Sequence, residues 1–205
     1  TVPANIFRQD LLNAGKGNGY HGFNYQPNSS FRDGQWHVMQ VRYPGMATSL
    51  FNTPKRIICN AAIFTGLTPV DTVPTGGLYT VGTQFSSSVG GRIVELGFYR
   101  AAGETGSNTL SLWADSGGNP LATVTPTCSS TGWCWASIPP VTITAGTRYR
   151  VGVTVNASHV KTGCGISGGY TRDPLTAHSG YWIAGSAFPT GGSCSNFFVD
   201  VKFDT

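Results

Sequence analysis

Short segments rich in β-branched and aromatic residues recur about every ten residues over the last two thirds of this chain, and this spacing constrains the fold most. Turn formers separate the segments, since the 205 residues include 28 Gly and 12 Pro. Helices do not fit between strands this closely spaced, so the pattern favours an antiparallel β-sandwich over a doubly wound parallel sheet. The expected strands are 79–85, 92–99, 109–114, 120–125, 135–138, 148–155, 181–184 and 196–203.

Apolar and polar residues alternate most clearly in the last expected strand. Alternate residues of a strand point to opposite faces of its sheet. We therefore expect one set to face the core (Val199, Val201, Phe203) and the other to face solvent (Phe198, Asp200, Lys202).

The first 58 residues carry weaker signals. Residues 36–43 read as one strand, and Ile6–Ala14 as one or two helical turns ended by Gly15. Residues 59–77 are rich in turn formers, which predicts a linker between a β module at 1–58 and a β-sandwich domain at 78–205. One strand is too little to close a core, so we expect residues 1–58 to form an incomplete module that is completed by sequence upstream, by the rest of the chain or by a neighbouring molecule.

Charge is sparse, at 11% of residues, and the 13 Lys and Arg against 9 Asp and Glu give a net charge of +4. The basic residues are scattered singly, whereas phosphate binding needs them clustered, so we do not expect a nucleic-acid partner. Apolar runs are only a few residues long, so we expect no membrane span.

Five cysteines indicate an oxidising compartment. We expect disulfides to involve Cys128 and Cys134, which flank a turn-like insert, and Cys164 and Cys194 in Gly-rich loops, with the connectivity left open. Cys59 is the odd cysteine: it pairs with sequence upstream, links to another chain, or is a buried thiol. The chain has no Cys-x-x-Cys or His-x-x-x-His pair, so we expect neither a metal site nor a cofactor.

Candidate catalytic residues have simpler explanations. Residues 165–169 have the Gly-x-Ser-x-Gly spacing of a nucleophile elbow, but that elbow needs a strand followed by a helix. His159, His178 and Asp173 would complete a triad only if the fold brought them together.

Acidic residues offer equally little for catalysis. Glu95 and Glu104 would have to face each other across a cleft for glycoside hydrolysis, yet one lies on an expected strand and the other in an expected turn. Asp115 could ligate calcium, but its loop is typical of an ordinary Asx-turn. We therefore expect a protein that is not an enzyme.

Several motifs in the second part of the chain resemble those of a known family. Residues 71–205 resemble the bacterial domain of unknown function 4082 in the segments Arg92-Ile-Val-Glu-Leu-Gly-Phe-Tyr-Arg100, Ser111-Leu-Trp113, Pro120-Leu-Ala-Thr123, 140–149, Phe188-Pro-Thr190 and 196–203.

A second resemblance concerns the beginning of the chain. Residues 5–58 resemble the tail of an immunoglobulin-like module of large bacterial exported proteins, in Phe7-Arg-Gln-Asp-Leu-Leu12, Gly19-Tyr-His-Gly-Phe23 and 31–37. The two resemblances imply an all-β protein, with a jelly-roll or immunoglobulin-like sandwich after a partial immunoglobulin-like module. They also imply a secreted or cell-surface location, and they carry over no activity.

The first functional hypothesis is structural. An incomplete sheet edge is a template for a strand from a neighbouring molecule, so copies of the chain could join into filaments through Val2, Ile6 and Phe7. A head-to-tail contact of this kind builds an open filament when it does not close.

The alternative hypothesis is a carbohydrate-binding or adhesion module of a larger secreted protein. Tyr170, Tyr181 and Trp182 lie in or beside Gly-rich loops, where flat rings can stack on the sugars of a cell-surface or matrix polysaccharide.

Overall fold

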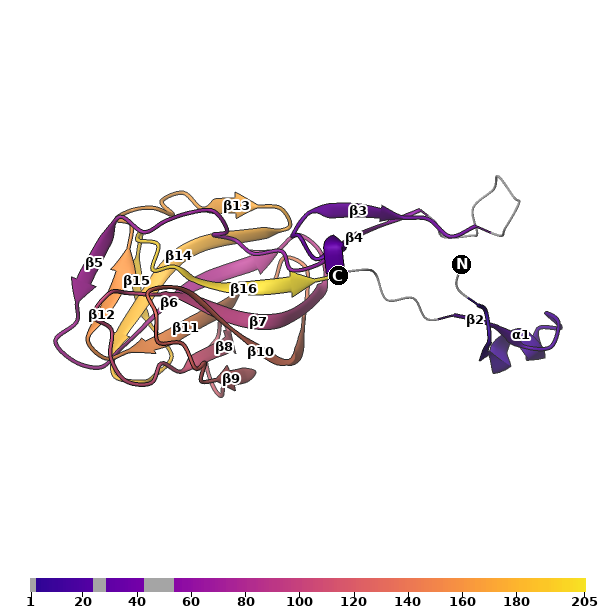
Figure 1. Ribbon diagram of the computed structural model, residues 1–205, viewed down its shortest axis with the longest axis horizontal. Coiled ribbons are helices and arrows are strands. Elements are labelled where there is room, and N and C mark those ends of the chain that lie inside the picture. Colours follow the sequence, from indigo (N-terminus) through magenta and orange to yellow (C-terminus); the bar gives the residue numbers. More distant parts are fainter. Residues whose placement is uncertain (1–2, 24–28, 43–53) are drawn as a thin grey trace. The chain divides into compact units, whose positions relative to one another are not determined.

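The computed structural model describes residues 3–23, 29–42 and 54–205 (Figure 1). The chain divides into two compact units, Thr1–Phe31 and Arg32–Thr205. The protein is all-β with antiparallel sheets, as the sequence predicts. In the described part of the chain, no helix is long and apolar enough to cross a membrane.

The larger unit is an antiparallel β-sandwich. Its smaller sheet has the strand order β10-β7-β16, formed by Gly132–Ile143, Gly91–Arg100 and Val199–Asp204. Its larger, seven-stranded sheet has the order β13-β14-β6-β11-β8-β9, with β15 also paired to β14. The strands of the larger sheet are β13 (Tyr170–Arg172), β14 (Leu175–Ala184), β6 (Tyr79–Ser87), β11 (Tyr149–Val155), β8 (Leu110–Ala114), β9 (Ala122–Val124) and β15 (Gly191–Ser193).

Two antiparallel pairs accompany the sandwich. One joins β5 (Asp71–Pro74) to β12 (Ser158–Lys161), and the other joins β3 (Trp36–Met39) to β4 (Lys55–Ile58). We call the first pair the β5–β12 ribbon. All eight strands predicted between residues 79 and 203 are present, whereas the strands β4, β5, β12, β13 and β15 of the larger unit were not predicted.

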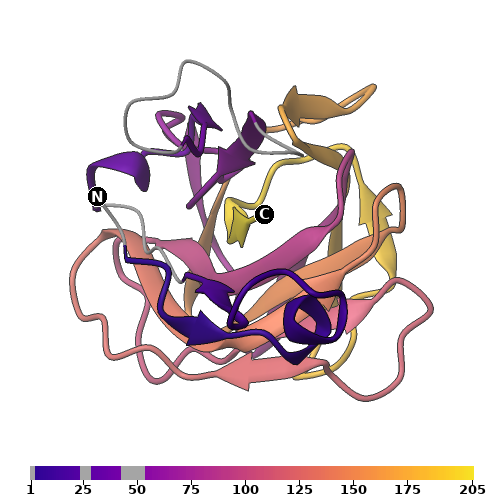
Figure 2. The same ribbon diagram turned by 90° about the vertical axis from the view of Figure 1, so that its right-hand side faces the viewer.

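The core lies between the inner faces of the two sheets. Figure 2 shows the strands of the larger unit curving around it. The Thr83 hydroxyl ties the two sheets together by donating to the carbonyl oxygen of Val199 at 2.7 Å. Fully buried side chains come from both sheets, among them Phe85, Leu110, Leu112, Val151, Ile93, Leu96, Val201 and Phe203.

The prediction that Phe198 and Asp200 face solvent is wrong, because both are almost completely buried. Residues 61–64 cover that side of β16. The backbone N–H groups of Ile63 and Phe64 donate to the Asp200 carboxylate at 3.0 and 2.7 Å. The alternation of apolar and polar residues in β16 does not show that residues 61–64 cover its second face.

The expected linker is also part of the sandwich domain. Ala61, Ile63 and Phe64 belong to its core, and Ala61 forms a β-bridge with Phe203. The turn formers of residues 59–77 separate this buried segment from β5, so they break the chain locally without ending the domain.

The expected module at residues 1–58 divides differently. The β3–β4 pair belongs to the larger unit, and the smaller unit holds β1 (Ile6–Phe7), the helix α1 (Gln9–Asn13), β2 (Tyr20–Gly22) and the 3-10 turn η1 (Ser29–Phe31). None of the described residues of the smaller unit belongs to the buried core. Part of the predicted strand at 36–43 appears as β3, and its last residue lies outside the described residues.

Candidate functional site

The most exposed aromatic side chain of the larger unit is Trp182 on β14, at 46% exposure. Its register partner on β6 is Val81, a core residue, so Trp182 lies on the inner face of the larger sheet. The ring of Tyr79 lies beside the indole, with centroids 6.3 Å apart. A Cβ atom on its other partner, Gly191, would lie only 3.2 Å from the indole, so this glycine makes room for the ring.

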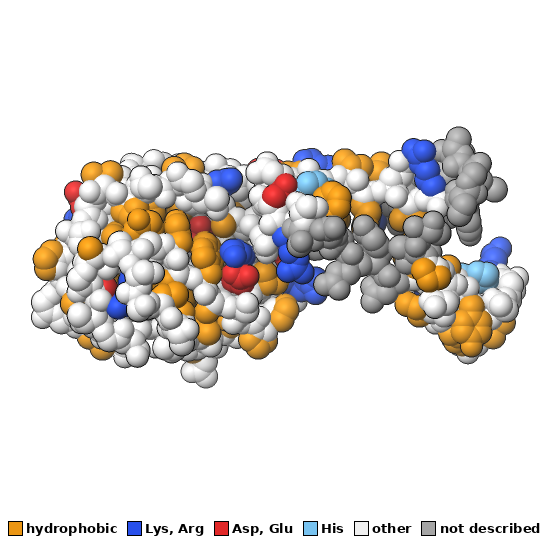
Figure 3. Space-filling view, viewed as in Figure 1, with side chains coloured by type: hydrophobic (Ala, Val, Ile, Leu, Met, Phe, Trp, Pro, Cys, Tyr) orange, Lys and Arg blue, Asp and Glu red, His pale blue; other side chains and the backbone are white. Residues whose placement is uncertain are grey.

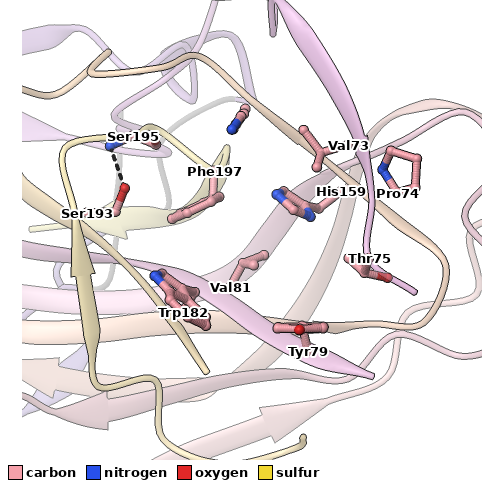
Figure 4. Close-up of a pocket in the computed structure, with 11 residues that line it drawn as sticks. Val73, Pro74, Thr75, Tyr79, Val81, His159, Trp182, Ser193, Ser195 and Phe197 are labelled. Carbon is pink, nitrogen blue, oxygen red and sulfur yellow. Dashed lines mark hydrogen bonds between the residues drawn. The ribbon is translucent and has the colours of Figure 1, made fainter. Parts of the chain in front are cut away.

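An open groove of about 300 Å³ separates this aromatic pair from the β5–β12 ribbon (Figure 4). We call it the Trp182 groove. Its lining residues come from two parts of the sequence, 73–81 and 159–197: Val73, Pro74, Thr75, Tyr79, Val81, His159, Lys161, Trp182, Ser193, Ser195 and Phe197.

Two polar atoms of the groove residues are buried without a hydrogen-bond partner: Nδ1 of His159 and Oγ1 of Thr75. Buried polar atoms in folded proteins are nearly always paired. The His159 ring packs edge-on against Phe197, with centroids 5.5 Å apart. A bound molecule that reached these two atoms would supply the hydrogen-bond partners that the protein does not.

The turn before β12 is fixed by the carboxylate of Glu104. It accepts hydrogen bonds from the backbone N–H groups of Asn156, Ala157 and Ser158, at 2.7 to 2.9 Å. Burial alone would raise the pKa of Glu104, but these donors and the Asn108 amide hold the pKa below its ordinary value. The anchored turn sets the position of His159, the second residue of β12.

The opposite wall is held by the disulfide between Cys164 and Cys194, whose Cα atoms are 4.3 Å apart. Ser193 and Ser195 flank Cys194, and the Ser195 N–H donates to the Ser193 hydroxyl at 3.0 Å. Residues 162 and 196 form a bridge beside the disulfide. One wall of the groove is therefore held by the hydrogen bonds of Glu104, and the opposite wall is held by a disulfide.

Charge in the groove comes from β12. Lys161 lines the groove two residues after His159, on the same side of the strand. Burial lowers the pKa of His159, and the nearby Lys161 lowers it further, while the more distant Glu104 opposes them. His159 is therefore neutral at pH 7, and Lys161 supplies the positive charge.

A sequence model of a family described as a domain of unknown function (DUF4082) matches residues 67–199. The chain belongs to the DUF4082 family. The matched segment contains every residue that lines the Trp182 groove. A comparison with curated proteins gave no match.

The aromatic trio predicted to bind glycans does not form one surface in this DUF4082 domain. The side chains of Tyr181 and Trp182 lie on opposite faces of β14. The Arg150 guanidinium lies 3.6 Å from the centre of the Tyr181 ring. Tyr170 packs against Phe64, with ring centroids 6.0 Å apart. Of the three predicted rings, only that of Trp182 therefore remains available for stacking on a sugar. The sequence alone does not show which neighbour covers a ring.

The residues of the possible triad also lie apart. His178 hydrogen-bonds Ser86 at 2.8 Å, Asp173 accepts from the Trp36 indole at 2.6 Å, and His159 lines the groove. No hydrogen bond links these three residues to one another within the described chain.

The acidic candidates are engaged elsewhere in the structure. Glu95 pairs with Lys202 at 2.6 Å, and Asp115 pairs with Arg150 at 2.5 Å and accepts from the Gln84 amide. Glu104 was expected in a turn; its side chain is buried, at 6% exposure, and anchors β12. Residues 3–23, 29–42 and 54–205 contain no cluster of His, Cys, Asp and Glu that could hold a metal.

The cysteines form two disulfides, one between Cys128 and Cys134 and the other between Cys164 and Cys194. Cys59 is a half-buried free thiol, and burial raises its pKa. A raised pKa lowers the fraction of reactive thiolate.

The residues predicted for assembly lie in the smaller unit. Ile6 and Phe7 form β1, which pairs with Tyr20–Gly22 of the same chain, and both side chains are exposed. Val2 lies outside the described residues.

Among the groove residues, Lys161, Tyr79 and Thr75 were not predicted as site residues, and His159 was considered only as a possible triad member. The sequence carries one usable signal for His159 and Lys161. In Ser158-His-Val-Lys161 the first and third residues are buried and the second and fourth line the groove, which is the alternation of a half-buried strand.

Proposed function

We propose that the DUF4082 domain of this chain binds carbohydrate in the Trp182 groove. The observation that carries the proposal is a half-exposed indole beside a groove whose buried polar atoms lack partners. An aromatic face gives a sugar ring an apolar surface, and a few fixed polar groups give it orientation. The protein is then a recognition module, and we propose no catalytic step for it.

The size and make-up of the groove support a small ligand. Its volume of about 300 Å³ lies at the lower end of the range for ligand pockets. Tyr79 and Trp182 form its apolar side, and the His159, Thr75 and Ser193 side chains offer hydrogen-bonding groups on the others (Figure 4).

Charged side chains are few on the surface of the larger unit. Figure 3 shows uncharged and hydrophobic side chains over most of the visible face of the larger unit. Two disulfides and the resemblance to exported bacterial proteins support a secreted or cell-surface location for this role.

The first prediction is that Trp182→Ala removes retention on insoluble polysaccharides. Truncating a central aromatic anchor costs at least about 30-fold in affinity. The measurement is pull-down of wild type and variant on cellulose, chitin, arabinoxylan and cross-linked polygalacturonate.

Leu121→Ala is the matched control, because Leu121 is 47% exposed, nearly as much as Trp182, and lies outside the groove. It should bind like the wild type, and all three proteins should melt at the same temperature. Equal loss in both variants, or wild-type protein that no polysaccharide retains, would overturn the proposal.

We propose self-association as a second role, carried by the smaller unit. Its large apolar side chains are exposed, including Ile6 at 44%, Phe7 at 42% and Tyr20 at 52%. A two-stranded pair is marginal on its own, and no third strand pairs with it among the described residues, which leaves a sheet edge that another strand can extend. Because β1 pairs with β2 within the chain, a second copy would add at that edge.

A further inference from the structure

The Trp182 groove is lined by a basic side chain and by no acidic one. Lys161 is the one Lys or Arg among the lining residues, the lowered pKa of His159 keeps that ring neutral at pH 7, and none of the lining residues, all of which the structure describes, is Asp or Glu. An ammonium group can donate hydrogen bonds to the hydroxyls of any sugar, but it adds charge attraction only when the sugar carries an anion.

Lys161 has no carboxylate partner in the structure. The ion pairs of residues 3–23, 29–42 and 54–205 are Arg8–Asp10, His37–Asp33, Arg150–Asp115 and Lys202–Glu95. Asp71 is the register partner of Lys161 across the ribbon, but the two do not come within ion-pair distance. The positive charge of Lys161 is therefore available to a ligand.

Two further hydrogen-bonding groups line the same groove. A neutral imidazole donates through Nδ1 in the tautomer that carries its proton there, and a threonine hydroxyl can donate through Oγ1. Both of these atoms, on His159 and Thr75, are buried and unpaired. A cation with two unpaired donors forms the surroundings that an oxyanion needs.

Resting on the proposed carbohydrate function, we infer that the ligand of the Trp182 groove is an anionic sugar. Its ring stacks on Trp182, and its carboxylate or sulfate binds Lys161 with help from His159 and Thr75. Both anions present the same chemistry to the groove, so the probes must separate them.

The test is calorimetric titration of the whole chain with two pairs of probes. One pair is tetragalacturonate and its methyl ester, and the other is a κ-carrageenan tetrasaccharide and its desulfated form. The proteins are wild type, Lys161→Met and the control Lys55→Met, which removes an exposed lysine outside the groove.

Wild type and Lys55→Met should bind at least one charged probe about tenfold more tightly than its uncharged counterpart. Lys161→Met should lose that preference and keep the affinity for the uncharged probe. The pair that shows the preference tells whether the anion is a carboxylate or a sulfate. A thermal melt of each variant establishes that it is folded.

Binding of charged and uncharged probes with equal affinity, abolished by Trp182→Ala, would overturn the anionic assignment and leave the carbohydrate proposal standing. A charge preference that survives in Lys161→Met would overturn the role of Lys161. No binding of any of the four probes, together with no retention on any polysaccharide, would overturn both proposals.

Discussion

Asp200 is a carboxyl group that the fold removes completely from solvent. It accepts backbone hydrogen bonds from Ile63, Phe64 and Val201. Burial raises the pKa of Asp200 to about 6 from an ordinary value of 3.8, against the opposing effect of these donors and of Arg172. The residue links residues 61–64 to β16, so its protonation affects the whole core.

The second prediction concerns the pH dependence of stability. A carboxyl group whose pKa is higher in the folded state binds its proton more tightly there, so its contribution is complete below pH 3.8 and is lost as the pH rises through about 6. The loss amounts to about 3 kcal/mol. We expect the stability difference between wild type and Asp200→Asn to change by this amount over that window, measured by urea unfolding at pH 4 and pH 7.

The comparison with the variant cancels the titration of other groups, such as Glu104. A difference in unfolding free energy that stays constant from pH 4 to pH 7 would contradict the raised pKa of Asp200.

At the scale of elements, the turn between β11 and β12 positions the groove. The only two Glu residues of the chain allow a matched test, because Glu104 is buried against this turn while Glu95 forms a partly exposed ion pair with Lys202. Replacing a carboxylate by an amide places an N–H₂ group against backbone donors.

The third prediction is that Glu104→Gln lowers the free energy of unfolding by about 3 kcal/mol, whereas Glu95→Gln lowers it by about 1 kcal/mol or less. Glu104→Gln should also weaken ligand binding, since β12 carries His159 and Lys161. The measurements are chemical unfolding and titration with the best ligand. Equal destabilisation by the two substitutions would show that Glu104 does not anchor the turn.

Strand positions in the sandwich could be predicted because they depend on local patterns. Alternation and turn residues marked β6 to β11 and β16 in the sequence. The ribbon strand β5 was missed because Thr72-Val-Pro-Thr-Gly-Gly77 has the composition of a connector, and only its pairing with β12 makes it a strand.

The site was less predictable than the fold. Trp182 was identified from its type and its Gly-rich surroundings. Tyr181 was grouped with it, but neighbouring residues of a strand point to opposite faces. The ring of Tyr181 lies under Arg150 of β11, and β6 separates β11 from β14 in the sheet, which no local pattern shows. His159 meets Trp182 through contacts between residues far apart in sequence, and no local pattern encodes those contacts.

The whole molecule consists of two units with different physical character. The larger unit contains the buried core, and the smaller unit exposes several large apolar side chains. The larger unit should therefore fold without the smaller one, and any self-association should depend on the smaller one.

The fourth prediction is that the full chain associates with increasing concentration and that a variant lacking residues 1–7 stays monomeric, since it lacks β1. Sedimentation velocity measures both. A variant lacking residues 1–31 should melt at the same temperature as the full chain. Association that is unchanged without residues 1–7, or a full chain that remains monomeric at all concentrations, would remove the self-association role.

The indole N–H resonances of the five Trp residues provide the most direct test of the groove as a glycan site. In a ¹H–¹⁵N spectrum titrated with the oligosaccharides above, the Trp182 signal, assigned with Trp182→Phe, should move progressively, while the signals of Trp36, Trp113, Trp133 and Trp135 stay in place. Movement centred on one of those four, or no movement with any glycan, would contradict glycan binding in the Trp182 groove.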